Sequence, residues 1–246
     1  MNAMLTHVRM EITLFFREII AIFFTFLLPG VSFAVLGQMF KDVDYSKGSY
    51  FDLYIPGMIA IIVFTTGFFT IGVQLVTDRE KGVYRRLQGT PLNPLNIFTG
   101  IFIKGFIAVF AGAVEIILIA KLYFKADITP DYIKFFLAGA FVSITFFALG
   151  FLIASLAKKM QTALAISFVS MYPMLFLSGA TLPIESLPDV LQKLSKYIPL
   201  TAVINVLQSG WNGTLFHKDL VFDYIYLLVL LVCSLFISIK YFKWQS

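Results

Sequence analysis

Six long runs of residues with almost no charged side chains dominate this sequence. Each is about twenty residues long, and since an α-helix rises 1.5 Å per residue, each could cross a hydrocarbon core of about 30 Å. Of the 246 residues, 13% are charged and 59% hydrophobic, whereas soluble domains are about 25% charged. The sequence therefore predicts an all-α integral membrane protein with six transmembrane helices. The predicted spans are residues 19–40, 53–76, 97–120, 133–157, 162–182 and 220–239.

The segments between the runs predict how the spans are arranged. A chain of 246 residues suits one compact bundle, so we expect a single transmembrane domain over residues 1–246. If the N-terminus is inside, all five arginines fall in inner segments, and the lysines of the outer loops are matched by about as many acids. Cytoplasmic loops of membrane proteins are enriched in Lys and Arg. We therefore expect a multi-pass protein of the cell membrane with both the N- and C-termini cytoplasmic.

The segment before the first run has helical periodicity. Its apolar residues recur at the spacing of one helix face: Leu5, Val8, Ile12, Phe15, Phe16 and Ile19. This pattern predicts an amphipathic N-terminal helix lying along the membrane surface. A simple N-terminal extension of the first span is an equally good interpretation.

A polar stretch, TDREKGVYRRLQGTPLNPLN at residues 77–96, separates the second and third spans. Residues 78–88 can form a short cytosolic helix, and Gly89 stands where a helix-ending glycine would. Asn93 is placed to cap the next helix, with Pro94 as its first residue. The simpler interpretation is a solvated basic loop that only sets the topology.

The segment between the fifth and sixth spans is also unusual. The sequence predicts a short amphipathic helix with Pro188 just inside its start and Pro199 at its end. Thr201 is placed to cap a second helix. Neither is long enough to cross the membrane, so both are expected to be re-entrant or interfacial helices on the outer face.

Two charged residues lie inside the third span. Lys104 and Glu115 are separated by three helical turns and share a face, but the rise of about 16 Å between them excludes a direct ion pair. Lys104 is near the cytosolic end, where its side chain can extend to the headgroups. Glu115 lies deeper and is a functional candidate. The alternative is that Glu115 bonds a neighbouring helix or reaches the outer headgroups.

The sequence offers no catalytic or cofactor-binding motif. No GxxxxGK[ST] phosphate-binding loop is present, so any ATP hydrolysis would occur on another chain. The histidines, His7 and His217, are far apart, and no metal-binding motif is present. We therefore expect no metal or cofactor bound to this chain, and no nucleic-acid partner.

Two segments carry a resemblance to a known family. The first is REKGVYRRLQGTPLNP, residues 79–94, with an acidic-basic-Gly start, a basic pair and a Thr-Pro-Leu-x-Pro end. The second is FLSGATLPIESLPDVLQKLSKYIPLTAVINVL, residues 176–207, with a Ser-Gly turn, a Pro and acid before a short amphipathic helix, and Pro-Leu-Thr. With the six spans, they make the chain resemble the permease subunits of ABC-2 type ABC transporters.

The resemblance implies a mechanism. The permease would pair with a second identical or related copy, and each would dock on a separate ATPase that binds ATP and Mg²⁺. The loop between spans two and three would be the cytosolic coupling helix, and the N-terminal helix would be a second contact. The implied charged contacts of the coupling helix are Asp78, Arg79, Glu80, Lys81, Arg85 and Arg86. The implied role is that of a transport subunit rather than an enzyme. The implied activity is export of a hydrophobic or amphipathic substrate such as a drug, antibiotic, lipid or glycan.

Three alternatives remain open at this stage. A stand-alone secondary carrier would use Glu115 for proton coupling and would work without an ATPase. A membrane-embedded enzyme would need clustered catalytic polar groups, which the spans hardly offer. A non-transporting membrane assembly or sensor partner is the third. The residues select neither the substrate, nor the direction of transport, nor homodimer over heterodimer.

Overall fold

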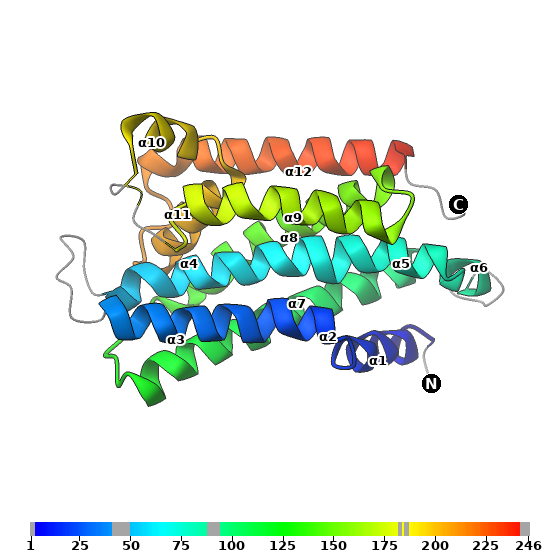
Figure 1. Cartoon of the computed structure of the whole chain (residues 1–246), viewed down its shortest axis with the longest axis horizontal. Helices are drawn as coiled ribbons and strands as arrows, with labels where there is room; N and C mark the ends of the chain where they lie inside the picture. The colour runs from blue at the N-terminus through cyan, green and yellow to red at the C-terminus, as the bar shows by residue number, and fades with distance from the viewer. Residues whose placement is uncertain (1–2, 41–49, 88–93, 182–183, 185–186, 242–246) are drawn as a thin grey trace.

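The computed structural model describes residues 3–40, 50–87, 94–181, 184 and 187–241. Every regular element in these residues is a helix, and six helices are long and apolar enough to cross a membrane. They lie side by side in one bundle (Figure 1). The prediction of an all-α protein with six membrane-crossing helices is therefore confirmed. The six are Ile19–Phe40, Tyr50–Glu80, Asn96–Tyr123, Tyr132–Leu156, Met160–Leu177 and Lys218–Tyr241.

Several of these long helices contain π-helical turns. The first span comprises α2 (Ile19–Ile22), η1 (Phe23–Leu27) and α3 (Leu28–Phe40), and the second α4 (Tyr50–Thr65), η2 (Thr66–Val73) and α5 (Gln74–Glu80). The others comprise α7 (Pro94–Leu118) with the π-helical η3 (Ile119–Tyr123), α8 (Tyr132–Leu156), α9 (Met160–Leu177), and a short 3₁₀ helix, η5 (Lys218–Leu220), with α12 (Val221–Tyr241). The shorter helices are α1 (Ala3–Phe15), α6 (Val83–Leu87), α10 (Asp189–Ser195) and α11 (Pro199–Trp211).

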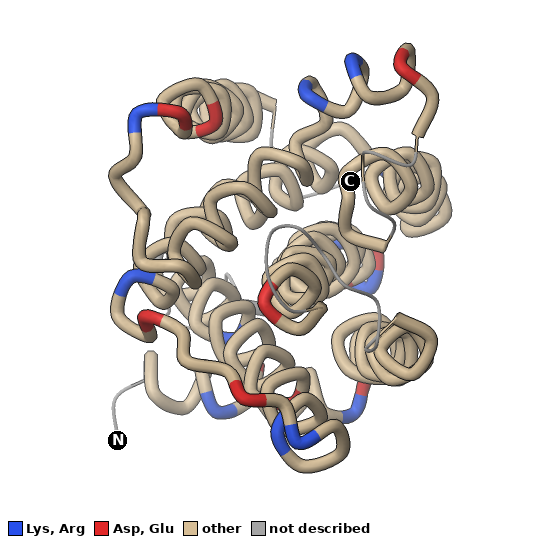
Figure 2. The backbone as a smooth tube through the Cα atoms, turned by 90° about the vertical axis from the view of Figure 1, so that its left-hand side faces the viewer, with Lys and Arg blue, Asp and Glu red and all other residues tan. Residues whose placement is uncertain are grey.

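The second span, Tyr50–Glu80, is here called the central helix. The most apolar 18 residues of this helix are all buried inside the bundle. In the other spans, 17% to 56% of the corresponding stretch is buried. It packs against α3, α7, α8, α9 and α11. Viewed from the end of the bundle, the helices surround it and their tubes are mostly uncharged (Figure 2). The central helix therefore forms the core, and the other spans share the lipid-facing surface.

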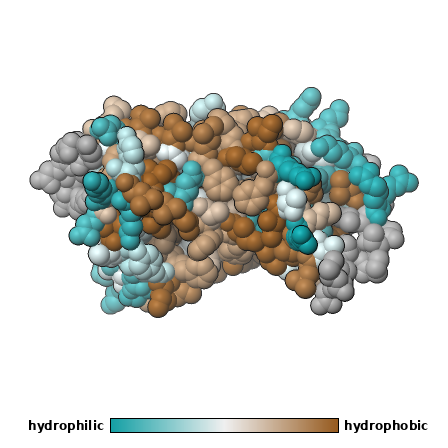
Figure 3. Space-filling view, turned by 90° about the horizontal axis from the view of Figure 1, so that it is seen from below, coloured by the Kyte–Doolittle hydropathy of each residue, from teal (hydrophilic) through white to brown (hydrophobic). Residues whose placement is uncertain are grey.

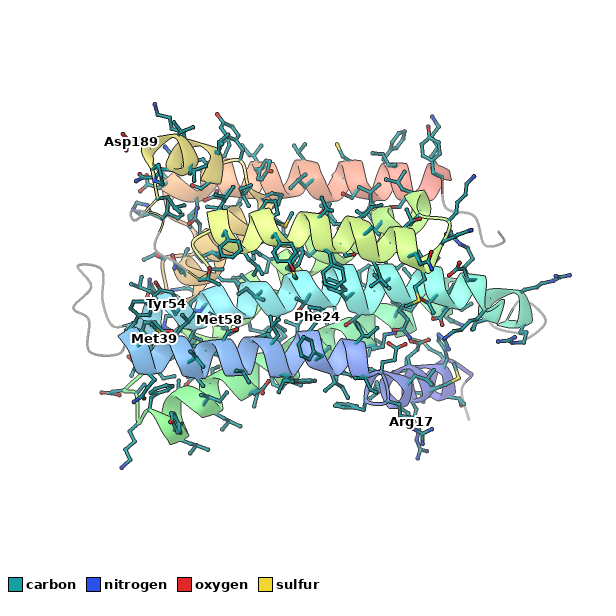
Figure 4. All side chains as sticks on the ribbon, viewed as in Figure 1. Arg17, Phe24, Met39, Tyr54, Met58 and Asp189 are labelled. Carbon is teal, nitrogen blue, oxygen red and sulfur yellow. The ribbon has the colours of Figure 1, made fainter. Side chains whose placement is uncertain are left out.

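Aromatic and glycine contacts fix the neighbours of the central helix. Phe24 of η1, labelled in Figure 4, lies between the first span and the central helix. It stacks on Phe69 of η2 with ring centroids 4.3 Å apart. On the other side, η2 and α8 touch backbone to backbone. A Cβ atom added to Gly67 would lie 2.5 Å from the carbonyl oxygen of Phe146, and one added to Gly150 would overlap the carbonyl of Gly67. Such close helix contacts require small residues at the crossing.

The two ends of the bundle carry different elements. Helices α1 and α6 lie at the same end as the last turns of α12, which we call the α6 end (Figure 1). Helices α10 and α11 lie at the opposite end, the α10 end (Figure 1). Apolar residues form a band across the middle of the molecule, with polar residues towards both ends (Figure 3). This distribution is the one expected for a bundle embedded in a bilayer.

The segment after the fifth span departs from the sequence prediction. Pro199 does not end the first short helix; it is the first residue of α11, with Ile198 as the N-cap. The first N–H groups of a helix have no partner within the helix, so proline, which lacks an N–H group, loses no hydrogen bond at that position. Thr201 lies inside α11 and is not its cap. The fifth span ends at Leu177, before residue 182, because Gly179 has a φ of +84° that a right-handed helix cannot continue.

Candidate functional site

The polar loop between the second and third spans forms the tip of the α6 end. The predicted single helix over residues 78–88 is interrupted: α5 ends at Glu80 and α6 covers Val83–Leu87. Gly82 between them has a φ of +66°, which reverses the backbone and which glycine adopts without steric cost. Helix α7 begins at Pro94, while the predicted cap Asn93 lies outside the described residues.

Arg79 is not a surface contact but a buried cap. The residue is 7% exposed. Its Nη1 donates to the carbonyl of Ala154 at 3.0 Å, and its Nη2 donates to the carbonyl of Ala157. The last carbonyls of an α-helix have no partner within the helix. Arg79 therefore satisfies the end of α8 and ties it to the central helix.

The next residue, Glu80, binds the following helix. Its Oε2 accepts a hydrogen bond of 2.9 Å from the backbone N–H of Met160, the first residue of α9. A carboxylate at a helix N-terminus also interacts favourably with the helix dipole. Arg79 and Glu80 thus hold the end of α8 and the start of α9, so the turn between them is fixed to the end of the central helix.

Three cations of the loop remain exposed: Lys81, Arg85 and Arg86. We call them the cationic tip. Tyr84, between them in sequence, is 3% exposed, and its burial raises the pKa of the phenol well above the usual value. Tyr84 therefore packs as a neutral side chain that anchors α6, while Arg85 and Arg86 remain free to meet a partner. Asp78, the sixth predicted contact, is half-buried on α5.

Lys104 is enclosed by protein instead of extending to the headgroups. It is 2% exposed. Its Nζ donates to Oε2 of Glu11 on α1 and to Oε1 of Gln74 on α5, both at 2.7 Å. The prediction that Lys104 reaches the headgroups is wrong, because these two oxygens give the ammonium group partners inside the bundle. One buried cation thus joins α1, α7 and the central helix.

Helix α1 turns a partly polar side towards the bundle. His7, Glu11 and Phe15, each one turn apart, are buried. His7 lies over Gly100 of α7, where an added Cβ would be 2.7 Å from its Cδ2. Its Nε2 is 3.9 Å from Oε1 of Glu11, too far for a hydrogen bond. Lys104, Glu11, Gln74 and His7 are called the Lys104 cluster below.

The apolar residues predicted for α1 lie partly outside the protein. Leu5 is 64% exposed and Phe16 is 51% exposed. Glu18 has extended backbone between α1 and α2, so α1 is not a straight extension of the first span. These exposed side chains belong to the side of α1 that does not pack on α7, because His7 and Glu11 face Gly100 and Lys104 of that helix.

Glu115 lies at the contact between α7 and α3. A Cβ added to Gly30 would be 2.8 Å from its Oε1, so the glycine makes room for the carboxyl group. Its Oε2 is buried and has no hydrogen-bond partner among the residues that the structure describes. Glu115 and Lys104 point to separate sites, since Lys104 is paired with Glu11 and Gln74.

Sequence reasoning did not identify Glu11, Gln74 or His7 as site residues. A signal for one of them exists, because a lysine inside an apolar span requires an anionic or carbonyl partner. Glu11 is the acid of the N-terminal helix and stands one turn after His7. The sequence does not show that residues 93 positions apart come together in the fold.

Comparison with known proteins gives a consistent result. The sequence profile of the family described as ABC-2 type transporter matches residues 3–211. The chain is 29% identical over 152 residues to "Probable multidrug ABC transporter permease YbhR" of Escherichia coli K12, an alignment that covers 59% of this chain and 40% of YbhR. It is 23% identical over 139 residues to "Inner membrane transport permease YhhJ" of the same organism, covering 56% of this chain and 37% of YhhJ.

A eukaryotic protein matches more of the chain. The chain is 23% identical over 198 residues to "ABC transporter G family member 20" of Dictyostelium discoideum, covering 78% of this chain and 27% of that protein. The chain therefore spans less than half the length of these three relatives.

Proposed function

The chain belongs to the ABC-2 type transporter family, and from this premise we propose that it is the permease subunit of an ATP-driven exporter whose ATPase is a separate chain. The six spans form one transmembrane domain, with the α6 end and both termini in the cytoplasm of the cell. ATP and Mg²⁺ bind to the partner ATPase. Two permease subunits, identical or related, assemble with the ATPases.

One observation carries this proposal: the cationic tip projects from a loop that is firmly tied to the bundle. Lys81, Arg85 and Arg86 are exposed, while the adjacent Arg79 and Glu80 bond α8 and α9. An acidic surface on the ATPase would attract the tip. Movement of that surface would pass through α5 to the central helix as rigid-body motion, because the buried Tyr84 holds α6 against the bundle.

The proposed substrate is hydrophobic or amphipathic. The central helix is lined by apolar and aromatic neighbours, and charged side chains inside the described spans are few. The similar protein YbhR carries the word "multidrug" in its name, which supports a drug-like compound over a polar one. Lipids, antibiotics and glycans with lipid anchors share the same chemistry.

Co-purification with the ATPase tests the proposal. The chain is expressed together with its neighbouring genes, any ATPase that co-purifies is identified, and the double variant Arg85→Glu/Arg86→Glu is compared with wild type. We expect the wild-type chain to retain the ATPase and the variant to retain at least about tenfold less, because like charges across an interface cost several kcal/mol.

The matched control is Lys193→Glu/Lys196→Glu. Both lysines are exposed at the α10 end, so this variant makes the same change in net charge at the opposite end of the bundle. It is expected to retain the ATPase. Equal retention by the Arg85/Arg86 variant and the wild type would remove the cationic tip from the ATPase contact.

A proton-coupled carrier that uses Glu115 is the second candidate function. The observation that favours it is the buried Oε2 of Glu115, which lacks a hydrogen-bond partner among the described residues. A carboxyl group in such surroundings is costly and is often functional. This candidate requires transport that is driven by a proton gradient without any ATPase and that is lost in Glu115→Gln.

A further inference from the structure

The Lys104 cluster joins the N-terminal helix to the helix that carries the cationic tip. Lys104 comes from α7, Glu11 from α1 and Gln74 from the first turn of α5. All three are at least nine-tenths buried. No other described contact brings a full charge of α1 so deep into the bundle, so this ion pair determines where α1 sits relative to the central helix.

A buried ion pair of this kind specifies position more than it adds stability. Removing an ammonium and a carboxylate from water is costly, and their mutual attraction only offsets that cost when the geometry is good. Here the Nζ atom has two oxygen partners at 2.7 Å. An apolar contact of the same size would not require partner atoms at fixed positions. The pair therefore favours one placement of α1 and penalises neighbouring ones.

His7 makes the same placement sterically specific. Its ring lies on Gly100, and a Cβ at that position would be 2.7 Å from Cδ2. The ring can approach α7 this closely only because the residue beneath it is glycine. A second point of contact is thereby fixed one turn from Glu11 on α1, so the helix can neither slide nor rotate without losing one of the two.

The cluster lies close to the tip along the chain. From Gln74 to Glu80 the helix rises about 9 Å, and the following residues form the cationic tip. Arg9 of α1 is exposed, and Arg17, in the turn that follows α1, points away from the bundle (Figure 4). Two exposed basic surfaces, one on α1 and one on α6, are thus held together through one buried lysine.

We propose that Lys104 is a positioning residue that locks α1 to the central helix, so that α1 and the cationic tip respond to the ATPase as one body. This inference rests on the proposed function, since it assumes that an ATPase engages the α6 end. Loss of the lock leaves the bundle, the tip and ATPase binding in place. It allows α1 and α5 to move independently, so that ATP hydrolysis is no longer fully converted into transport.

The test measures transport per ATP hydrolysed in liposomes that contain the purified permease–ATPase complex. Lys104→Met and Glu11→Gln each remove one charge of the pair. Both are expected to bind the ATPase and hydrolyse ATP, but transport per ATP should fall by about threefold or more, as for other residues of coupling networks. The control is Lys121→Met, which removes an exposed lysine from the same span and should leave the ratio unchanged.

The charge exchange Glu11→Lys/Lys104→Glu separates positioning from general damage. It restores opposite charges between α1 and α7, so transport per ATP hydrolysed should rise part of the way back to the wild-type value. A nonspecific packing defect would instead become worse. A transport-to-ATP ratio equal to wild type in Lys104→Met would overturn the proposal. If that variant does not fold, Glu11→Gln decides in the same way.

Different results would contradict the proposed function and the positioning role of Lys104. A wild-type complex that hydrolyses ATP but does not transport substrate contradicts the proposed function. The positioning role of Lys104 is then contradicted too, because it rests on that function. A wild-type complex with ATP-driven transport, together with unchanged ratios in both single variants, contradicts only the positioning role of Lys104.

Discussion

Arginines of the same loop have different surroundings, and this decides what each can do. Arg79 is buried and bonds the end of α8, while Arg85 is exposed on α6. Only the exposed Arg85 is available to a partner protein. The buried Arg79 contributes to the stability of the permease itself.

Replacing Arg79 therefore tests stability. Arg79→Met keeps much of the side-chain volume but removes the donors to Ala154 and Ala157. Because hydrogen bonds of charged groups are worth about 1.5–3 kcal/mol, we expect a clearly lower melting temperature of the detergent-solubilised protein. Arg85→Met is the matched control and should melt like wild type. Equal melting temperatures of both variants would contradict the capping role.

The partly buried carboxyl group of Glu18 should make the stability of the folded protein depend on pH. Burial at the bend between α1 and α2 raises the pKa of its carboxyl group, although the nearby Lys104 and Lys81 partly oppose this. A carboxyl group with a raised pKa in the folded state contributes stability below its unfolded pKa and loses that contribution as the pH rises through the folded pKa.

Glu18→Gln removes the ionisable group. The variant should therefore melt at a higher temperature than wild type at neutral pH, and the difference should vanish at acidic pH, where Glu18 is protonated in both states. A lower melting temperature of Glu18→Gln at neutral pH would show that the charged form is stabilised.

At the scale of elements, the contact between η2 and α8 depends on glycine. A Cβ on Gly150 would overlap the carbonyl of Gly67, whereas a Cβ on Gly139 of the same helix would have no atom within 4 Å. Gly150→Ala should destabilise the bundle by about 1–3 kcal/mol, as overpacked cores do. Gly139→Ala should be neutral or slightly stabilising, and thermal unfolding of the two variants side by side measures the difference.

The spans could be predicted from the sequence because each depends on its own composition. A run without charges must avoid water along its entire length, so the six helices were evident from the residues alone. The interruption at Gly82 was not, because a glycine can stand inside a helix as well as end one. The start of α11 at Pro199 was missed for a similar reason, since proline both ends and begins helices.

The site was predictable only in outline. The loop at the tip was identified by its charges, but the sequence does not state which charges are buried. Arg79 and Glu80 became caps for α8 and α9, which lie far along the chain. The pairing of Lys104 with Glu11 likewise depends on the way α1 folds back on α7, which composition and periodicity do not contain.

At the scale of the whole molecule, the central helix connects both ends. At the α10 end, Trp211 of α11 donates from Nε1 to Oδ1 of Asp52 at 3.1 Å, and Gln208 donates to the carbonyl of Leu53 at 3.2 Å. At the α6 end, Arg79 and Glu80 hold the α8–α9 turn. A displacement of the cationic tip therefore has a continuous path to α11 through one buried helix.

The most direct measurement is transport by the purified protein in liposomes, with a fluorescent amphipathic dye as the probe. We expect dye movement only when the partner ATPase and ATP are both present, and none when a proton gradient is applied to the chain alone. Dye movement by the chain alone under a proton gradient, abolished in Glu115→Gln, would contradict the proposed ATP-driven export and place the energy source at Glu115 instead.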